Sequence, residues 1–204
     1  MPENCTMLPD GYKRRKKIDL QHNKKTALFV NLLSLQIFAV FLIPLFFIKS
    51  VPSLIKGMLS DASTESLTAA VFLCGGIILY LIAHELTHGL FMKIFGKAKV
   101  KFGITGFYAY TASMAYFNKR SYIITALAPV VIWSMILIPT TVLTYLYSSI
   151  YFQVFYILEG ANLAGSAGDM YMAVRIGRME KNVLIKDSGT DMIVYGTHVD
   201  TYGI

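Results

Sequence analysis

Long apolar runs alternate with short polar segments along this chain. The first run, Thr26 to Ile48, has 23 residues without a charge. The second begins at Leu67 and continues through Phe91, and the third, Ser121 to Leu158, has 38 uncharged residues. A helix rises about 1.5 Å per residue, so roughly 20 residues cross a hydrocarbon core about 30 Å thick. The runs therefore predict transmembrane helices.

The third run is too long for a single span. Ser148 and Ser149 offer a tight turn in its second half, which divides it into two helices at 121–147 and 150–174. Together with spans at 26–48 and 67–92, the pattern predicts an all-α membrane protein with about four transmembrane helices. The last of these helices is the polar one, since it contains Glu159, Asn162, Ser166 and Asp169.

The segment from Val100 to Phe117 has a different pattern. It is rich in Tyr, Phe and Thr, includes Gly103 and Gly106, and shows no helical apolar stripe. Such a composition favours β-strands, so we expect a membrane-associated β-hairpin between the second and third helices. Two roles are open for this hairpin. It covers a site structurally, or it offers an edge strand to which an unwound substrate pairs.

Charge follows the apolar pattern and sets the predicted topology. The chain has 204 residues, of which 55% are apolar and 15% charged, and a net charge of +7. Seventeen of its nineteen Lys and Arg residues lie in 1–25, 93–120 and 175–204. By the positive-inside rule these segments are cytosolic, and 49–66 is an external loop. Basic residues that flank apolar runs argue for a membrane partner and against nucleic acid.

The same reasoning divides the chain into three parts. We expect a basic cytosolic N-terminal segment at 1–25, a four-helix core at 26–174 and a small cytosolic tail at 175–204, with both termini cytosolic. Within the tail, Val183 to Lys186 and Met192 to Tyr195 form a possible hairpin. The two cysteines, Cys5 and Cys74, indicate neither a disulfide framework nor a cysteine zinc site.

The sequence His84-Glu85-Leu86-Thr87-His88 introduces chemistry into the second span. Residues four apart lie on one helical face, so the two imidazoles can hold one zinc ion. Glu85 lies beside that face, where its carboxylate can take a proton from water at the metal. The alternative is a polar cluster that joins helices. Ionisable groups within a membrane cost about 2.5 kcal/mol or more and are normally functional, which favours the metal site.

A catalytic zinc usually has three protein ligands, so one remains to be found. His88 lies five residues before Lys93, about 7.5 Å from the predicted cytosolic boundary. Asp169 lies six residues before Arg175, which places it about 9 Å from the same boundary. Asp169 is therefore the expected third ligand. Glu159, about 15 Å further in, is a weaker alternative, and Asp169 could instead cap its helix or pair with Arg175.

These residues resemble the site-2 protease group of intramembrane zinc metalloproteases. The resemblance rests on His84-Glu85-x-x-His88 and on the run from Asn162 to Asp169. More narrowly, the chain is similar to the small bacterial zincin membrane peptidases, formerly a domain of unknown function. The resemblance implies zinc held by two His and an Asp, a Glu base and a nearby Asn. In this sequence they fall at His84, His88, Asp169, Glu85 and Asn162.

Asn162 has two open roles, as a donor to the substrate carbonyl or as a polar contact between helices. The chain departs from the larger group in its third-ligand segment, where Gly168-Asp169-Met170 replaces Leu-Asp-Gly.

We therefore expect a zinc metalloendopeptidase of the cell membrane. Its substrate would be a membrane-embedded or membrane-adjacent polypeptide cleaved near the cytosolic face. Two alternatives remain at this stage. One is a non-catalytic zinc-binding membrane protein of the immunity or transporter-accessory type, and the other is a metal transporter.

Overall fold

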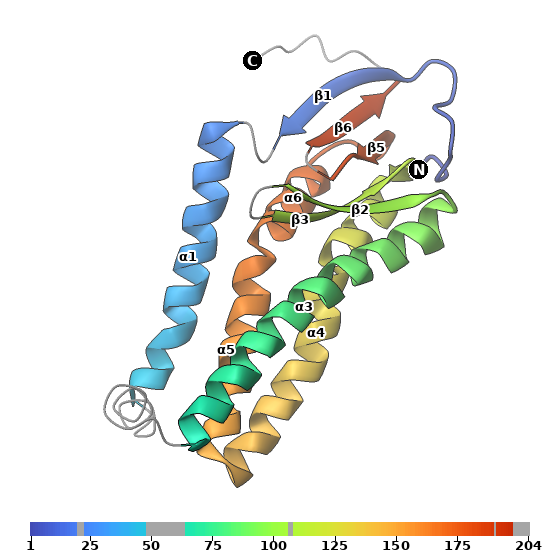
Figure 1. The fold of residues 1–204 in the computed structure, drawn as a ribbon. Helices are drawn as coiled ribbons and strands as arrows, with labels where there is room; N and C mark the ends of the chain where they lie inside the picture. Colours follow the sequence, from blue (N-terminus) through green and yellow to red (C-terminus); the bar gives the residue numbers. More distant parts are fainter. Residues whose placement is uncertain (20–22, 48–63, 106–107, 190, 198–204) are drawn as a thin grey trace. The chain divides into compact units, whose positions relative to one another are not determined.

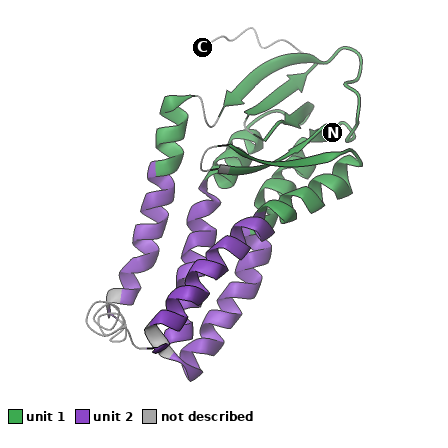
Figure 2. Ribbon diagram, viewed as in Figure 1, with its two compact units in different colours: residues 1–31, 85–129, 168–204 green, residues 32–84, 130–167 purple. Residues whose placement is uncertain are grey.

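The computed structural model describes residues 1–19, 23–47, 64–105, 108–189 and 191–197 (Figure 1). The chain forms two compact units (Figure 2). Unit 1 comprises Met1–Asn31, Glu85–Pro129 and Gly168–Ile204, and unit 2 comprises Leu32–His84 and Val130–Ala167. The chain passes between the units four times, so both termini belong to unit 1. The predicted external loop lies mostly outside the described residues.

Three predicted transmembrane helices are present with nearly the predicted bounds. They are α1, Lys24–Phe47, α3, Thr64–Gly96, and α4, Lys119–Tyr147. Each contains a segment long and apolar enough to cross a membrane, at Lys24–Leu45, Leu67–Gly96 and Lys119–Tyr147. Length and composition therefore support a membrane protein, with three candidate spans in the described part of the chain.

The predicted fourth span at 150–174 is wrong as a single helix. The structure has two helices there, α5, Ser149–Gly165, and α6, Ala167–Gly177. Ser166 caps the first of them by donating its backbone N–H to Ala164 O and Asn162 O. Gly165 and Gly168 flank this break, and glycine costs helix stability. With 17 residues, α5 is about 26 Å long, shorter than the core of a typical bilayer.

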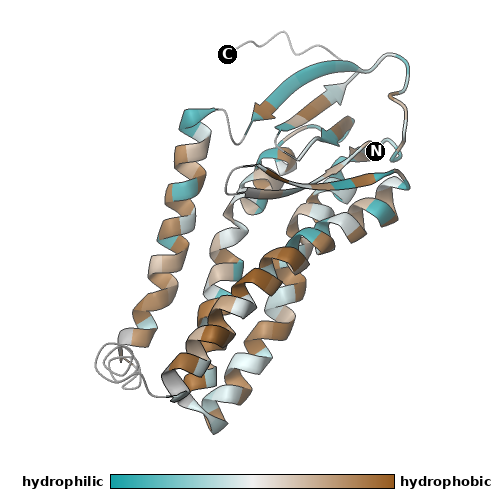
Figure 3. Ribbon diagram, in the orientation of Figure 1, coloured by the Kyte–Doolittle hydropathy of each residue, from teal (hydrophilic) through white to brown (hydrophobic). Residues whose placement is uncertain are grey.

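The helices of unit 2 present many large apolar side chains at the surface. Exposed examples are Leu35 on α1, Leu79 on α3 and Leu143 on α4, each more than half exposed. The hydropathy colouring shows the same apolar character along these helices (Figure 3). Soluble monomers rarely expose contiguous apolar surface on this scale, so these helix faces fit contact with lipid.

Unit 1 contains a four-stranded antiparallel sheet, which corrects the all-α prediction. The strands are β1, Lys13–Asp19, β4, Tyr116–Asn118, β5, Val183–Asp187, and β6, Asp191–Gly196. Their order is β1-β6-β5-β4. The predicted C-terminal hairpin is confirmed as β5 and β6, but these strands lie in the middle of the sheet. The hairpin is therefore a structural element of unit 1.

The basic N-terminal segment is also part of this sheet. Strand β1 pairs with β6, and Lys17 forms a salt bridge of 2.7 Å with Asp191. Because β1 is rich in Lys and Arg, the hydrophobic pattern of the sequence did not predict a strand there. Lysine on an edge strand discourages further strand pairing, which accounts for such a composition.

The core of unit 1 is formed where one face of the sheet packs on helices. Phe117 from β4, Val183 and Ile185 from β5, and Met172 and Ile176 from α6 are all almost completely buried in one cluster. This packing holds the start of α6 in place.

The predicted hairpin between the second and third helices is confirmed. Strands β2, Val100–Thr105, and β3, Tyr108–Ser113, form a separate two-stranded antiparallel sheet. Val100 pairs with Ser113 and Thr105 with Tyr108, so the register is continuous.

The turn between β5 and β6 gives the first testable prediction. Gly189 has φ of +86°, and a Cβ there would overlap the Tyr110 ring. Gly189→Ala should lower the free energy of unfolding by about 1–2 kcal/mol through backbone strain alone. Thermal unfolding in detergent measures this loss. Ser188→Ala, at an exposed neighbour, is the matched control and should have almost no effect.

Candidate metal centre

His84 and His88 lie one turn apart on α3. Both side chains are buried, each with 8% of its surface exposed. The division between the units falls between His84 and Glu85, but α3 runs through it without interruption, so the helix itself sets the spacing of the two rings. They project from one helical face, as the sequence predicts.

Each imidazole is oriented by a hydrogen bond at Nδ1. His88 Nδ1 lies 3.0 Å from the carbonyl oxygen of Thr125, on α4. A carbonyl only accepts, so His88 donates from Nδ1 and Nε2 is its remaining ring nitrogen. His84 Nδ1 lies 2.9 Å from the Tyr80 hydroxyl, one turn earlier on α3. Metal-binding histidines commonly have their second nitrogen held in this way.

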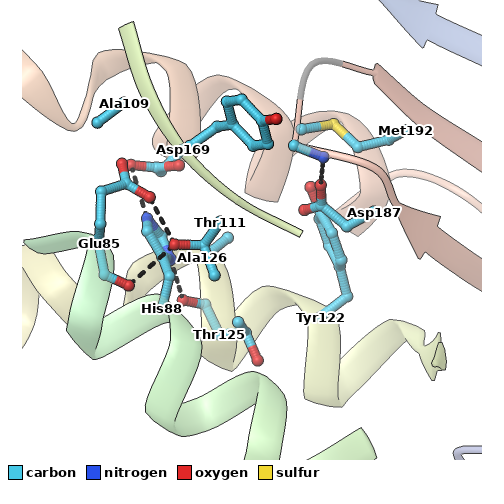
Figure 4. Close-up of a pocket in the computed structure, with 12 residues that line it drawn as sticks. Glu85, His88, Ala109, Thr111, Tyr122, Thr125, Ala126, Asp169, Asp187 and Met192 are labelled. Carbon is cyan, nitrogen blue, oxygen red and sulfur yellow. Dashed lines mark hydrogen bonds and ion pairs between the residues drawn. The ribbon is translucent and has the colours of Figure 1, made fainter. Parts of the chain in front are cut away.

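Asp169 stands in the first turn of α6, after the break at Ser166. Its Oδ2 lies 3.5 Å from His88 Nε2 (Figure 4). The guanidinium of Arg175 lies over the ring of Tyr171. Asp169 therefore contacts His88, as expected if both residues are ligands of one metal ion.

The three predicted ligands form a possible metal-binding group. One ligand atom from each of His84, His88 and Asp169 lies within 4.8 Å of the other two. Zinc with four ligands at about 2.0–2.1 Å places neighbouring ligand atoms roughly 3.3 Å apart. The separation of 3.5 Å between His88 and Asp169 is close to this value. Two imidazoles and one carboxylate are also a donor set that zinc accepts, so the residues present fit this ion.

Glu159, the weaker candidate ligand, has its carboxylate engaged elsewhere. Its oxygens accept hydrogen bonds from Ser134 Oγ at 2.6 Å and from Asn162 Nδ2 at 3.1 Å. All three of these residues belong to unit 2. Asp169 therefore remains the better candidate for the third ligand.

Asn162 belongs to the same polar network. Its side chain is completely buried, and its Oδ1 accepts a hydrogen bond of 3.0 Å from the Tyr80 hydroxyl. These contacts join α3, α4 and α5, which fits the polar contact between helices that the sequence offers as one role. A contact between Asn162 and substrate stays a prediction.

Glu85, the predicted base, is held by the hairpin. Thr111 on β3 donates its hydroxyl hydrogen to the Glu85 carboxylate at 2.7 Å. The Thr111 hydroxyl oxygen also lies 3.0 Å from the Glu85 carbonyl oxygen (Figure 4). The hydrogen bond to the carboxylate fixes the direction in which the carboxylate points. The hairpin therefore covers the site and orients one of its groups.

A cavity of about 110 Å³ adjoins these groups within unit 1. It is large enough for several water molecules. Its walls come from α3, β3, α4, α6 and the β5–β6 hairpin. The lining residues are Glu85, His88, Ala109, Tyr110, Thr111, Tyr122, Thr125, Ala126, Asp169, Asp187, Gly189 and Met192.

Asp187 is a cavity residue that the sequence reasoning missed. It ends β5, is 7% exposed, and accepts a hydrogen bond of 2.8 Å from the Gly189 N–H. Burial raises the pKa of this carboxyl to about 7, although the Gly189 hydrogen bond opposes the shift. In the sequence, Asp-Ser-Gly is typical of a turn, so no signal separates this buried acid from an exposed turn residue.

Zinc content tests the ligand assignment directly. The purified wild type should bind one zinc ion per chain. His88→Ala and Asp169→Ala should each lower zinc affinity by at least about 100-fold, because each removes a ligand. Metal analysis after dialysis against a zinc buffer measures the occupancy. Asp191→Asn, which alters a salt-bridged carboxylate of the sheet, is the control and should retain the ion.

The raised pKa of Asp187 predicts a pH-dependent stability of the zinc-free protein. The folded state holds this proton more tightly than the unfolded chain, whose carboxyl has an ordinary pKa near 3.8. The free energy of unfolding should therefore fall as pH rises from about 4 to 7 and then level off. Asp187→Asn removes this contribution while keeping an acceptor for Gly189.

Thermal unfolding across this pH range compares the two proteins. Asp187→Asn should be more stable than the wild type by roughly 2–4 kcal/mol at pH 8, and the difference should nearly vanish at pH 4. Parallel stability curves over the whole range would contradict a raised pKa at this residue.

Comparison with known proteins supports the metal centre. A search of curated proteins gave no match, and a search of solved structures gave none either. The model of one protein family, described as "Putative zincin peptidase", matches residues 76–184, more than half of the chain. The match includes both histidines, Glu85 and Asp169, and it confirms the narrower resemblance found in the sequence. The chain belongs to this zincin peptidase family.

Proposed function

We propose that this protein is an intramembrane zinc metallopeptidase that hydrolyses peptide bonds of a membrane-embedded or membrane-adjacent polypeptide near the cytosolic face. The observation that carries this proposal is the grouping of His84, His88 and Asp169 beside a cavity that Glu85 also lines. Membership of the zincin peptidase family supports the metallopeptidase chemistry.

The roles of the residues follow from their positions. His84, His88 and Asp169 would hold the zinc, which when bound supplies Lewis acidity toward a carbonyl oxygen and toward water. Glu85 would take a proton from a water molecule in the cavity and deliver it to the departing amine. Thr111 would keep the Glu85 carboxylate turned toward the cavity through its hydrogen bond.

The membrane assignment rests on the three candidate spans and on the path of the chain. If α5 serves as a fourth, shorter crossing, the number of spans is even and both termini lie on one side of the membrane. The concentration of Lys and Arg near both ends favours the cytosol as that side. A multi-pass protein with cytosolic termini is the arrangement that these features support.

The hairpin has a second proposed role in substrate binding. Strand β3 pairs with β2 at one edge, and within the described residues no strand pairs with its other edge. Ala109, Tyr110 and Thr111 of β3 line the cavity. A helical substrate must unwind before its peptide bonds become accessible, and an unwound segment could pair with β3.

Glu85→Gln tests the proposed chemistry. The amide keeps the size of the side chain but cannot take a proton, so peptide hydrolysis should fall by about 10²–10⁴-fold while zinc remains bound. The assay incubates the purified zinc-loaded protein with a peptide mixture in detergent and identifies new termini by mass spectrometry.

Glu180→Gln is the matched control, because Glu180 is largely exposed and pairs with Arg15 away from the cavity. It should cleave like the wild type. Equal cleavage by the wild type and Glu85→Gln would contradict the role of Glu85. Wild-type function in cells that carry only Glu85→Gln would favour a non-catalytic zinc protein.

A further inference from the structure

Glu159 is a buried carboxylate that the proposed chemistry does not use. Only 3% of its surface is exposed, and it lies on α5 among the apolar helices of unit 2. Burying a carboxylate costs free energy unless strong interactions compensate for it. Its oxygens are satisfied by the neutral groups of Ser134 and Asn162. Because burying the Glu159 carboxylate costs free energy and its partners carry no charge, this arrangement suggests a role in orienting the hydrogen bonds of those partners.

In its carboxylate form, Glu159 orients the Asn162 amide. A carboxylate only accepts hydrogen bonds, so Ser134 must donate its single hydroxyl hydrogen to Glu159. The Ser134 oxygen then accepts from Asn162 Nδ2 at 2.9 Å. Asn162 Nδ2 also faces Glu159 at 3.1 Å and, at a longer 3.3 Å, the carbonyl oxygen of Val130. With the NH₂ group on this side, Asn162 Oδ1 must face Tyr80.

The orientation of Asn162 in turn decides which way the Tyr80 hydroxyl points. Tyr80 donates its one hydrogen to Asn162 Oδ1 at 3.0 Å. Its oxygen can then only accept from His84 Nδ1, at 2.9 Å. His84 therefore carries its proton on Nδ1, and the lone pair of the neutral ring is on Nε2, the nitrogen suited to a metal ligand.

The comparison with His88 shows why such a relay is needed. His88 Nδ1 faces a carbonyl oxygen, which accepts only, so this contact places a proton on Nδ1 directly. His84 is held by a hydroxyl, which can either donate or accept. The Asn162 backbone carbonyl oxygen, 3.4 Å from the Tyr80 hydroxyl, is a second but longer acceptor for the same hydrogen. If Tyr80 instead donated to Nδ1, the proton of His84 would remain on Nε2, where it would block metal binding.

We propose that Glu159 acts through Asn162 and Tyr80 as a positioning residue that fixes the tautomer of His84 and thereby strengthens zinc binding. All five residues of this relay, Tyr80, His84, Ser134, Glu159 and Asn162, belong to unit 2. The inference rests on the metal centre and does not require peptidase activity.

Glu159→Leu is the main test, because it removes the acceptor while keeping an apolar side chain of similar volume. The change leaves the Ser134 hydroxyl and one Asn162 N–H without this acceptor, so a modest loss of stability is expected. The protein is labelled with ¹⁵N-histidine and studied without zinc in detergent micelles by long-range ¹H–¹⁵N NMR, with His84→Ala assigning the signal. Wild-type His84 should show the proton on Nδ1.

In Glu159→Leu the Nε2–H form of His84 should appear, and zinc affinity should fall by about tenfold. The melting temperature should fall only modestly, because the apolar side chain of leucine fills a similar volume at this position. His88 should keep its proton on Nδ1 in both proteins, since Thr125 holds it independently. Tyr80→Phe should weaken zinc binding to a similar extent, and the double variant should show no further loss, because both changes break one relay.

Ser166→Ala is the matched control at the C-cap of the same helix. Ser166 is completely buried, its Oγ has no hydrogen-bond partner among the described residues, and alanine keeps the backbone N–H that caps α5. It should leave both the His84 tautomer and zinc affinity unchanged. The relay is overturned if Glu159→Leu keeps His84 in the Nδ1–H form with zinc affinity within twofold of the wild type. If Glu159→Leu does not fold, Tyr80→Phe decides by the same two measurements.

Discussion

The hydrogen bonds at Nδ1 of the two histidines are the interactions on which the proposed site depends. A buried imidazole can offer either nitrogen, and only one choice directs a lone pair toward the metal. Thr125 settles this for His88 with a backbone carbonyl, and Tyr80 does so for His84 with a hydroxyl. The spacing of the motif brings the rings to one face, but these partners make the rings usable as ligands.

The break at Ser166 is the second constraint, and it explains how an acid reaches the histidines. A continuous α5 would give a complete fourth span, whereas the break starts a new helix at Ala167, two residues before Asp169. Asp169 then stands in the first turn of α6, where the helix dipole favours a negative charge. The shortening of α5 is thus linked to the placement of Asp169, the proposed third ligand. Glu159, which stays on α5, has a different role.

The sequence predicted the parts of the site that depend on local spacing or on helix depth. His84, His88 and Glu85 follow from helical periodicity, and Asp169 follows from its distance to the basic boundary. The same approach missed the four-stranded sheet, because β1 and β6 are more than 170 residues apart and the charges of β1 conceal its strand. Tyr80 and Asp187 were missed for a related reason, since their roles depend on partners that only the folded chain brings near.

The balance of charge in the cavity connects Asp187, which the sequence did not predict, with Glu85 and Asp169, which it did. Among the described residues that line it, Glu85, Asp169 and Asp187 are acidic and none is Lys or Arg. A divalent cation with two neutral imidazoles is offset by the charges of Asp169 and Glu85 together. A third carboxylate would leave the cavity with one uncompensated charge, and burial disfavours that state. Burial raises the pKa of Asp187, and the neighbouring carboxylates Asp169 and Glu85 add to the shift, so a neutral Asp187 limits the negative charge that the cavity must hold.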